Sequence, residues 1–254
     1  MLLLVNVPYR MVEKNLERAS VLSVGLEIYL DNRVVEGIDM DHVKELSQKL
    51  QDRAIPCTVH APFMDLSPGG YDRSIRVITQ DKLKRSAEVA NLFRAKTCVC
   101  HPGYDKWRFD GNQQLWLEGS VDTWTQVLGA AGKDLPIVVE NIFEETPETF
   151  VVLFDHFRDK NLGYCFDSGH FNLFSKVSLD NWLAPLRSKI REMHLHDNHG
   201  TSDDHLPIGA GSFPFRELKQ FLAGVRGNEI IFTVEPHSEK TVVDSIQRLK
   251  EFLG

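Results

Sequence analysis

Short apolar runs alternate with amphipathic helical patterns from one end of the chain to the other. Runs rich in β-branched and aromatic residues indicate strands, whereas apolar residues that recur every three or four positions indicate helices. The pattern predicts strands over residues 2–7, 24–30, 57–60, 97–101, 137–141, 162–166, 190–195 and 230–235. It predicts helices over residues 11–19, 40–53, 73–95, 112–131, 147–157, 179–186, 215–224 and 239–252.

This regular alternation determines the expected fold class. Strands that each lead into a helix form parallel sheets, and eight such units close into a barrel. The chain of 254 residues contains no linker rich in proline, glycine or serine and no low-complexity tract. We therefore expect an α/β protein with one (β/α)8 TIM barrel, a single domain over residues 1–254.

The composition limits the expected cellular compartment of the protein and the kinds of partner that it can bind. No apolar run is long enough for a membrane span, and the apolar N-terminal segment ends at Pro8 without the features of a signal peptide. The four cysteines fall in strand-like runs, which predicts free buried thiols and a cytoplasmic protein. The net charge of −7 disfavours nucleic acid as a partner without excluding a local basic patch. A homo-oligomer remains open.

Imidazole and carboxylate groups gather where the predicted strands end. The densest segment runs from Met193 to Asn198 and continues with Asp203-Asp204-His205. Similar residues follow other strands, namely His60, His101, Glu140, Asp167, His170 and Glu235. Active sites of (β/α)8 barrels lie at the C-terminal ends of the strands. Such density is costly unless a cation neutralises it, so we expect a metal centre there.

Strand parity supports one convergent centre. Alternate residues of a strand share a face, so His60, His101, Glu140 and Glu235 can all point into the barrel. Parity does not choose between His194 and His196, which face the same way. Zinc and manganese accept this mixture of imidazole and carboxylate ligands. We expect one to three divalent ions per chain, zinc or manganese.

The motifs together resemble one family of barrels. They are His60-Ala61-Pro62-Phe63, His101-Pro102-Gly103, Glu140-Asn141, Asp167-Ser168-Gly169-His170, His194-Leu195-His196-Asp197, Asp203-Asp204-His205 and Glu235. In order and strand placement they resemble the xylose-isomerase-like TIM-barrel superfamily, which contains sugar isomerases, epimerases and endonuclease IV. The resemblance spans essentially the whole chain.

The resemblance implies metal ligands residue by residue. Glu140, Asp167, His194 and Glu235 match the ligands of the single metal in the sugar-acting members. Endonuclease IV adds two zinc ions, whose further ligands match His60 and His101 for one ion and His170, Asp203 and His205 for the other. The resemblance also favours His194 over His196 as the ligand. His196 would then support a ligand or face the substrate.

Other segments depart from the endonuclease IV pattern. The chain around residues 27–33 is acidic and aromatic, and the loop over residues 63–70 carries no positive charge, although a DNA-binding loop would need it. Many relatives have Gly-Glu-Gly where this chain has Gly209-Ala210-Gly211.

The favoured hypothesis is a metal-dependent isomerase or epimerase of a small sugar or sugar phosphate. Glu140 and Glu235 would move the proton next to the carbonyl while the metal polarises the carbonyl. The expected substrate-binding residues are His196 and Glu27 for hydroxyls, Trp107 and Phe63 for the sugar face, and Arg108, beside Lys106, for a phosphate.

Two alternatives remain open. The first is a multi-zinc phosphodiesterase that resembles endonuclease IV, in which a zinc-bound hydroxide attacks a phosphodiester. The full set of nine ligand types favours it, while the loops and the net charge of −7 disfavour DNA as its substrate. The second is a metal-stabilised barrel that binds a sugar without turnover.

Overall fold

A closed barrel forms the centre of the protein. The computed structural model describes residues 2–158, 160–225 and 229–254, and within them eight parallel strands pair in chain order, with β8 returning to β1. The predicted (β/α)8 barrel is therefore confirmed. The strands are β1 Leu2–Pro8, β2 Gly25–Tyr29, β3 Cys57–His60, β4 Cys98–Cys100, β5 Ile137–Glu140, β6 Leu162–Asp167, β7 Ile190–His194 and β8 Ile231–Val234.

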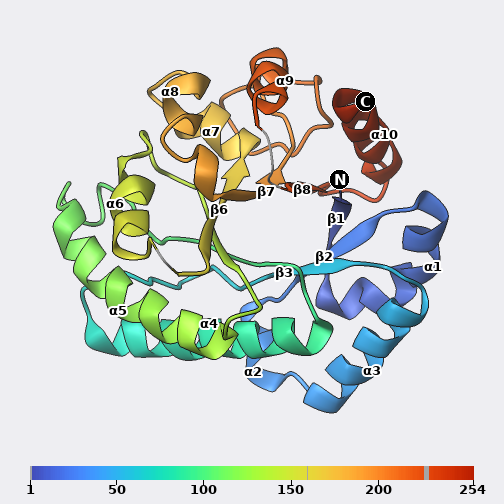
Figure 1. Ribbon diagram of the computed structural model, residues 1–254, viewed down its shortest axis with the longest axis horizontal. Helices are drawn as coiled ribbons and strands as arrows, with labels where there is room; N and C mark the ends of the chain where they lie inside the picture. Colours follow the sequence, from blue (N-terminus) through green and yellow to red (C-terminus); the bar gives the residue numbers. More distant parts are fainter. Residues whose placement is uncertain (1, 159, 226–228) are drawn as a thin grey trace.

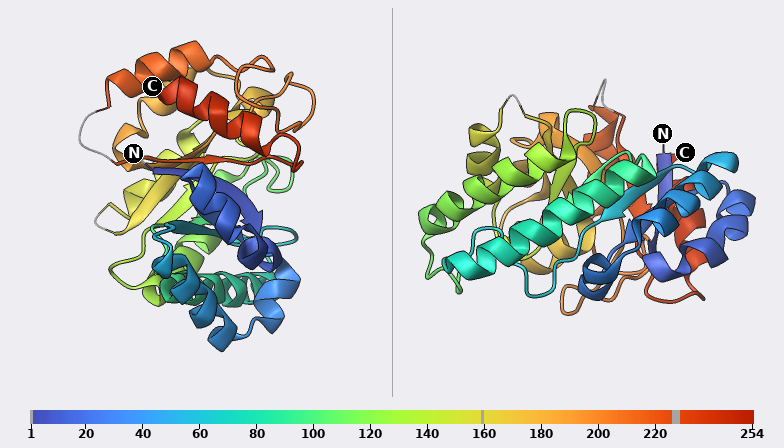
Figure 2. Two further views of the ribbon diagram at one scale, coloured as in Figure 1. Left: turned by 90° about the vertical axis from the view of Figure 1, so that its right-hand side faces the viewer. Right: turned by 90° about the horizontal axis from the view of Figure 1, so that it is seen from below.

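Helices surround the barrel, and the long α4 and α5 run side by side (Figures 1 and 2). They are α1 Val12–Leu22, α2 Asn32–Gly37, α3 Met40–Asp52, α4 Arg73–Phe93, α5 Gln113–Ala131, α6 Glu148–His156, α7 Ser168–Phe174, α8 Leu179–Leu183, α9 Phe215–Ala223 and α10 Val242–Leu253. The sequence prediction missed α2 and α7. Both are short helices stabilised by an aspartate side chain, Asp31 or Asp167, that accepts backbone N–H groups at the N-terminus.

Two separate cores stabilise the fold. The larger lies between the strands and the helices and includes the fully buried Trp116, Trp124 and Trp182. The smaller lies inside the barrel, where Val99, Val138 and Cys165 pack together. Polar side chains are also buried inside the barrel, and the fully buried ones include Glu27, Glu192, Thr58 and Thr233. Charged groups therefore lie inside the barrel, directly beneath the C-terminal ends of the strands.

The cysteine prediction is confirmed: Cys57, Cys98, Cys100 and Cys165 are all buried and free. Among the described helices, none combines the length and apolar character needed to cross a membrane.

Candidate metal centre

Four residues at the ends of β5, β6, β7 and β8 form what we call the inner cluster: Glu140, Asp167, His194 and Glu235. Nδ1 of His194 lies 3.5 Å from Glu140 Oε2, 3.5 Å from Glu235 Oε1 and 4.0 Å from Asp167 Oδ2. This nitrogen is buried and has no hydrogen-bond partner among the described residues. An unpaired buried nitrogen is costly, and a cation between it and the three carboxylates would satisfy all four groups. The donor set therefore fits zinc or manganese.

Two histidines share an oxygen of the inner cluster. His60 Nε2 lies 3.1 Å and His101 Nε2 3.3 Å from the same atom, Glu140 Oε2. The ring of Phe63 stacks on that of His101, with 4.3 Å between their centroids. His60, His101 and Glu140 together offer three ligand atoms close enough to hold one ion.

A further group of imidazoles surrounds Asp203. His205 Nε2 lies 3.0 Å and His170 Nε2 3.5 Å from Asp203 Oδ2. His196 Nδ1 lies 3.8 Å from Asp203 Oδ1, and His196 Nε2 lies 2.9 Å from Asp167 Oδ2. The ring of His196 is parallel to that of His205, with centroids 3.9 Å apart. His196 therefore lies inside this network, in contact with one carboxylate of the inner cluster.

Electrostatics hold the network together without a metal. Burial would raise the pKa of Glu140, but His194 and His101 hold it well below its usual range. Burial would lower the pKa of His60, but its hydrogen bond to Glu140 raises the pKa to about 9. Burial lowers the pKa of His101 to about 4. Of the two imidazoles on one carboxylate oxygen, His60 thus carries the proton at neutral pH and His101 does not.

A further ion bound by His60, His101 and Glu140 is expected to displace a proton from His60. His60 must give up the proton that its pKa of about 9 retains, so the apparent metal affinity should rise with pH until that value is passed. Zinc titration by calorimetry at pH 7, in two non-chelating buffers of different ionisation enthalpy, should give different heats. His60→Gln should release about one proton fewer. Equal heats in both buffers would contradict this account.

Asp197 does not join the cluster, although it lies in the densest segment of the sequence. Its Oδ2 accepts hydrogen bonds from the backbone N–H of Gly209 at 3.1 Å and Gly211 at 2.8 Å. Its Oδ1 accepts one from Phe213 at 3.0 Å. A Cβ on Gly211 would lie 2.2 Å from the carbonyl oxygen of Asn198, so a side chain cannot be accommodated there. Asp197 therefore anchors the loop that carries Asp203 and His205.

The expected substrate-binding residues differ in position. Phe63 and Arg108 line a cavity of about 1150 Å³ that opens above the inner cluster, and Tyr29, Phe143 and His237 line it too. Trp107 is 83% exposed, does not line this cavity, and lies against Lys106. Lys106 is itself paired with Glu145 at 2.6 Å. The position of Trp107 therefore gives no support to sugar stacking.

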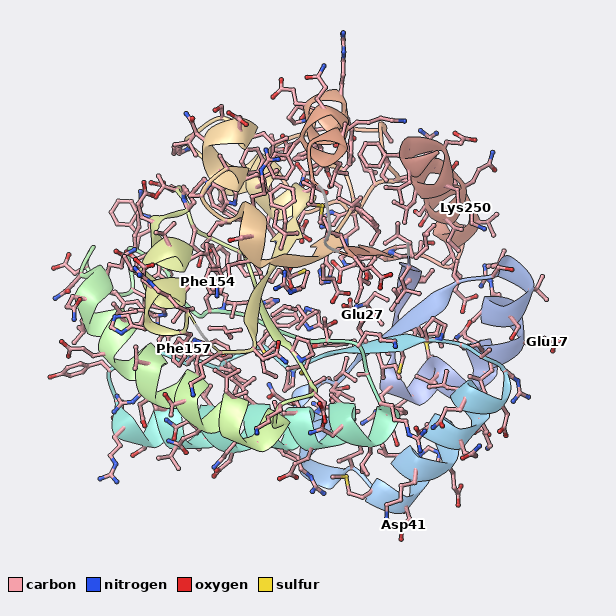
Figure 3. The ribbon with its side chains drawn as sticks, in the orientation of Figure 1. Glu17, Glu27, Asp41, Phe154, Phe157 and Lys250 are labelled. Carbon is pink, nitrogen blue, oxygen red and sulfur yellow. The ribbon has the colours of Figure 1, made fainter. Side chains whose placement is uncertain are left out.

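The expectation for Glu27 needs correction. This carboxylate is fully buried inside the barrel, beneath the inner cluster, and near the centre of the molecule in Figure 3. Its oxygens accept hydrogen bonds from Asn6 and lie within hydrogen-bonding distance of His194. A carboxylate so enclosed does not reach a sugar hydroxyl in the cavity.

The sequence reasoning missed Asn6, Glu192 and His237. Glu192 lies two residues before His194 and shares its face of β7, so parity could have found it. Burial, then the charge of Glu27, raises the pKa of Glu192 to about 8. Asn6 is the one polar residue within an apolar run, and its amide reaches both Glu27 and Glu235. The ring of His237 stacks on that of His205, with 3.6 Å between the centroids.

Comparison with known families agrees with this geometry. The sequence model of the family described as Xylose isomerase-like TIM barrel matches residues 23–252. The chain belongs to this family. An uncharacterized protein of Methanocaldococcus jannaschii is 29% identical over 214 residues, which cover 81% of this chain and 73% of that protein.

Several solved structures share the fold of this chain. A D-tagatose 3-epimerase-like protein superposes with a TM-score of 0.82 and 25% identity, covering 100% of this chain and 97% of its own. A protein of Thermus thermophilus, from a structure soaked with ZnCl2, superposes with a TM-score of 0.77 and 23% sequence identity. The match covers 99% of this chain and 98% of that protein. Endonuclease IV of the same organism superposes with a TM-score of 0.72 and 18% sequence identity. The match covers 100% of this chain and 99% of the endonuclease. These likenesses establish the fold and leave the reaction open.

Proposed function

We propose that this member of the xylose isomerase-like family is a divalent-metal-dependent isomerase or epimerase of a small sugar or sugar phosphate. One observation carries the proposal. The unpaired Nδ1 of His194 lies among three carboxylates, two of which, Glu140 and Glu235, line a cavity of about 1150 Å³ that is large enough for a small molecule. The likeness to a D-tagatose 3-epimerase-like protein supports the same class of substrate.

Glu140, Asp167, His194 and Glu235 would hold the metal. A divalent ion bound there acts as a Lewis acid that polarises the carbonyl of the sugar and so acidifies the neighbouring C–H bond.

Glu235 is the better placed of the two glutamates to accept the proton. Both side chains line the cavity, but that of Glu235 is 12% exposed, whereas that of Glu140 is 1% exposed. Burial raises the pKa of Glu235, and a raised pKa makes its carboxylate a stronger base at neutral pH. Return of the proton to a neighbouring carbon, or to the opposite face of the same carbon, gives the isomer or the epimer. We propose Glu140 as the second acid–base group.

The lining of the cavity offers both apolar and charged groups for binding the substrate. Phe63 and Tyr29 offer apolar faces, and Arg108 offers a positive charge, in the lining of the same cavity. We propose that the aromatic rings pack against the carbon skeleton and that Arg108 binds a phosphate or hydroxyl group.

Solvent exchange tests the reaction class without knowledge of the sugar. Ketoses, aldoses and their phosphates, incubated in D2O with zinc- or manganese-loaded protein, should include a substrate that gains deuterium next to its carbonyl. NMR measures both the exchange and the new isomer. Glu235→Gln should lower the exchange rate by roughly 10²- to 10⁴-fold, the range for loss of an acid–base group. Absence of exchange across the panel, with metal bound, would contradict the proposal.

A second candidate is a multi-zinc phosphodiesterase, favoured by the two further ligand groups around the inner cluster. His60 and His101 converge on Glu140, while His170 and His205 converge on Asp203. Metal analysis after purification without chelator separates the candidates. Three tightly held zinc ions with nicking of abasic-site duplex DNA would favour the phosphodiesterase, and one exchangeable ion without nicking would favour the isomerase.

A further inference from the structure

His194 is held by a carboxylate on the side away from the inner cluster. Its Nε2 lies 3.1 Å from Glu27 Oε2, and both side chains are fully buried. With a metal ion bound at Nδ1, which faces the three carboxylates of the inner cluster, Nε2 would be the nitrogen that keeps a proton and donates it to Glu27. The hydrogen bond at one ring nitrogen fixes which nitrogen is free to bind a metal.

The other oxygen of Glu27 reaches a second ligand through Asn6. Asn6 lies on β1 opposite Glu27 on β2, and its Nδ2 donates to Glu27 Oε1 at 2.8 Å. The same nitrogen donates to Glu235 Oε1 at 3.2 Å. The acceptor on Glu27 therefore orients the amide of Asn6, and the amide in turn orients the carboxylate of Glu235. One buried side chain contacts His194 directly and Glu235 through one intermediate residue.

Two neighbouring histidines, His60 and His205, have a backbone carbonyl where His194 has a carboxylate. The Nδ1 atoms of His60 and His205 lie 2.8 and 2.7 Å from the backbone carbonyl oxygens of Ala61 and Glu235. Nδ1 of His170 lies 3.0 Å from the carbonyl oxygen of Asn141 but also 3.2 Å from Glu140 Oε1. A carbonyl fixes the ring but carries no net charge, whereas a carboxylate also makes the imidazole a stronger electron donor. His194 of the inner cluster thus has a carboxylate behind its ring that His60 and His205 lack.

We propose that Glu27 is a positioning residue that makes the inner cluster the tightest divalent-metal site of this protein. It does so by fixing the tautomer of His194 and, through Asn6, the orientation of Glu235. The inference rests on the metal dependence in the proposed function, but not on the identity of the substrate or the reaction.

Glu27→Gln tests this proposal because glutamine keeps the size of the side chain but loses one acceptor. Its amide can accept from His194 or from Asn6, not from both, since its other end is a donor. Zinc affinity of the full chain, measured by competition with a chromophoric chelator, should fall by roughly 10- to 100-fold at the tightest site. Asn6→Ala, which keeps the contact between Glu27 Oε2 and His194, should weaken zinc binding by a smaller factor.

Glu192→Gln is the control matched in size and burial, and it removes less charge at pH 7 because the pKa of Glu192 is about 8. Glu192 is equally buried in the barrel interior, but its oxygens accept from the hydroxyls of Thr97 at 2.5 Å and Thr233 at 2.9 Å rather than from a metal ligand. Its zinc affinity should stay within about twofold of the parent protein, because a structural role alone moves stability rather than affinity.

Three outcomes separate the proposals. Parent protein that binds no zinc would remove the metal dependence itself. Parent protein that binds zinc, with Glu27→Gln binding equally well or Glu192→Gln binding as weakly as Glu27→Gln, would overturn this inference alone. Should Glu27→Gln fail to fold, the test is made on the parent protein and Asn6→Ala. Nitrogen NMR of the zinc-loaded proteins should show His194 protonated at Nε2. A proton at Nδ1 of His194 would overturn the inference.

Discussion

Glu140→Gln should abolish metal binding and turnover together. Glu140 Oε2 lies 3.1, 3.3 and 3.5 Å from nitrogens of His60, His101 and His194, and its Oε1 lies 3.2 Å from His170. An amide in its place has a single neutral acceptor and presents N–H groups to the remaining nitrogens. We expect metal content below a tenth of the parent value and a loss of activity of roughly 10³-fold or more. Elemental analysis and the deuterium-exchange assay measure the two effects.

The control for this substitution is Glu148→Gln. Glu148 lies exposed in the first turn of α6, away from the inner cluster, and its replacement removes the same charge. Metal content and activity should both stay at the parent level. If Glu140→Gln retained a full complement of metal, the inner cluster would not be the metal site.

Removal of the metal should lower the melting temperature by about 10 °C. A ligand that binds only the folded state stabilises it by about 4 kcal/mol at a concentration a thousand times its dissociation constant. For a chain of this size, each kcal/mol corresponds to roughly 2 to 4 °C. The unpaired His194 Nδ1 and the buried carboxylates around it are the groups that lose their counter-ion.

Scanning calorimetry before and after chelation measures this shift. Zinc or manganese should restore the original transition. Calcium, which prefers a larger set of oxygen ligands, should not. An unchanged transition after complete removal of the metal would show that protons on the histidines compensate the carboxylates as well as a metal does.

The barrel could be predicted because its signals are local. Each strand is a short buried run, and each is followed by an amphipathic helix, so no contact between distant residues was needed to count them. The positions of His60, His101, Glu140 and Glu235 at strand ends were equally accessible. The structure brings all four to one end of the barrel, with His60 and His101 on the same oxygen of Glu140.

The roles of single residues were harder to predict from the sequence. His194 and His196 have the same parity, and only the distances show that His194 Nδ1 faces the inner cluster while His196 contacts Asp167 and lies beside Asp203. Asp197 looked like a member of the acidic cluster but accepts the backbone N–H groups of the following loop instead. Glu27 lies too deep inside the barrel to serve as a substrate-binding residue.

The sequence by itself determined the class of fold, the end of the barrel that carries the chemistry and the kinds of ligand. These follow from periodicity and residue type, which are properties of short segments. The tertiary structure alone decided which oxygen each histidine contacts, which nitrogen of His194 is unpaired, and that Asn6 and Glu27 support the inner cluster from below. Most of those relations join residues more than twenty positions apart, such as Asn6 and Glu27, and closure of the barrel fixes the distances between them.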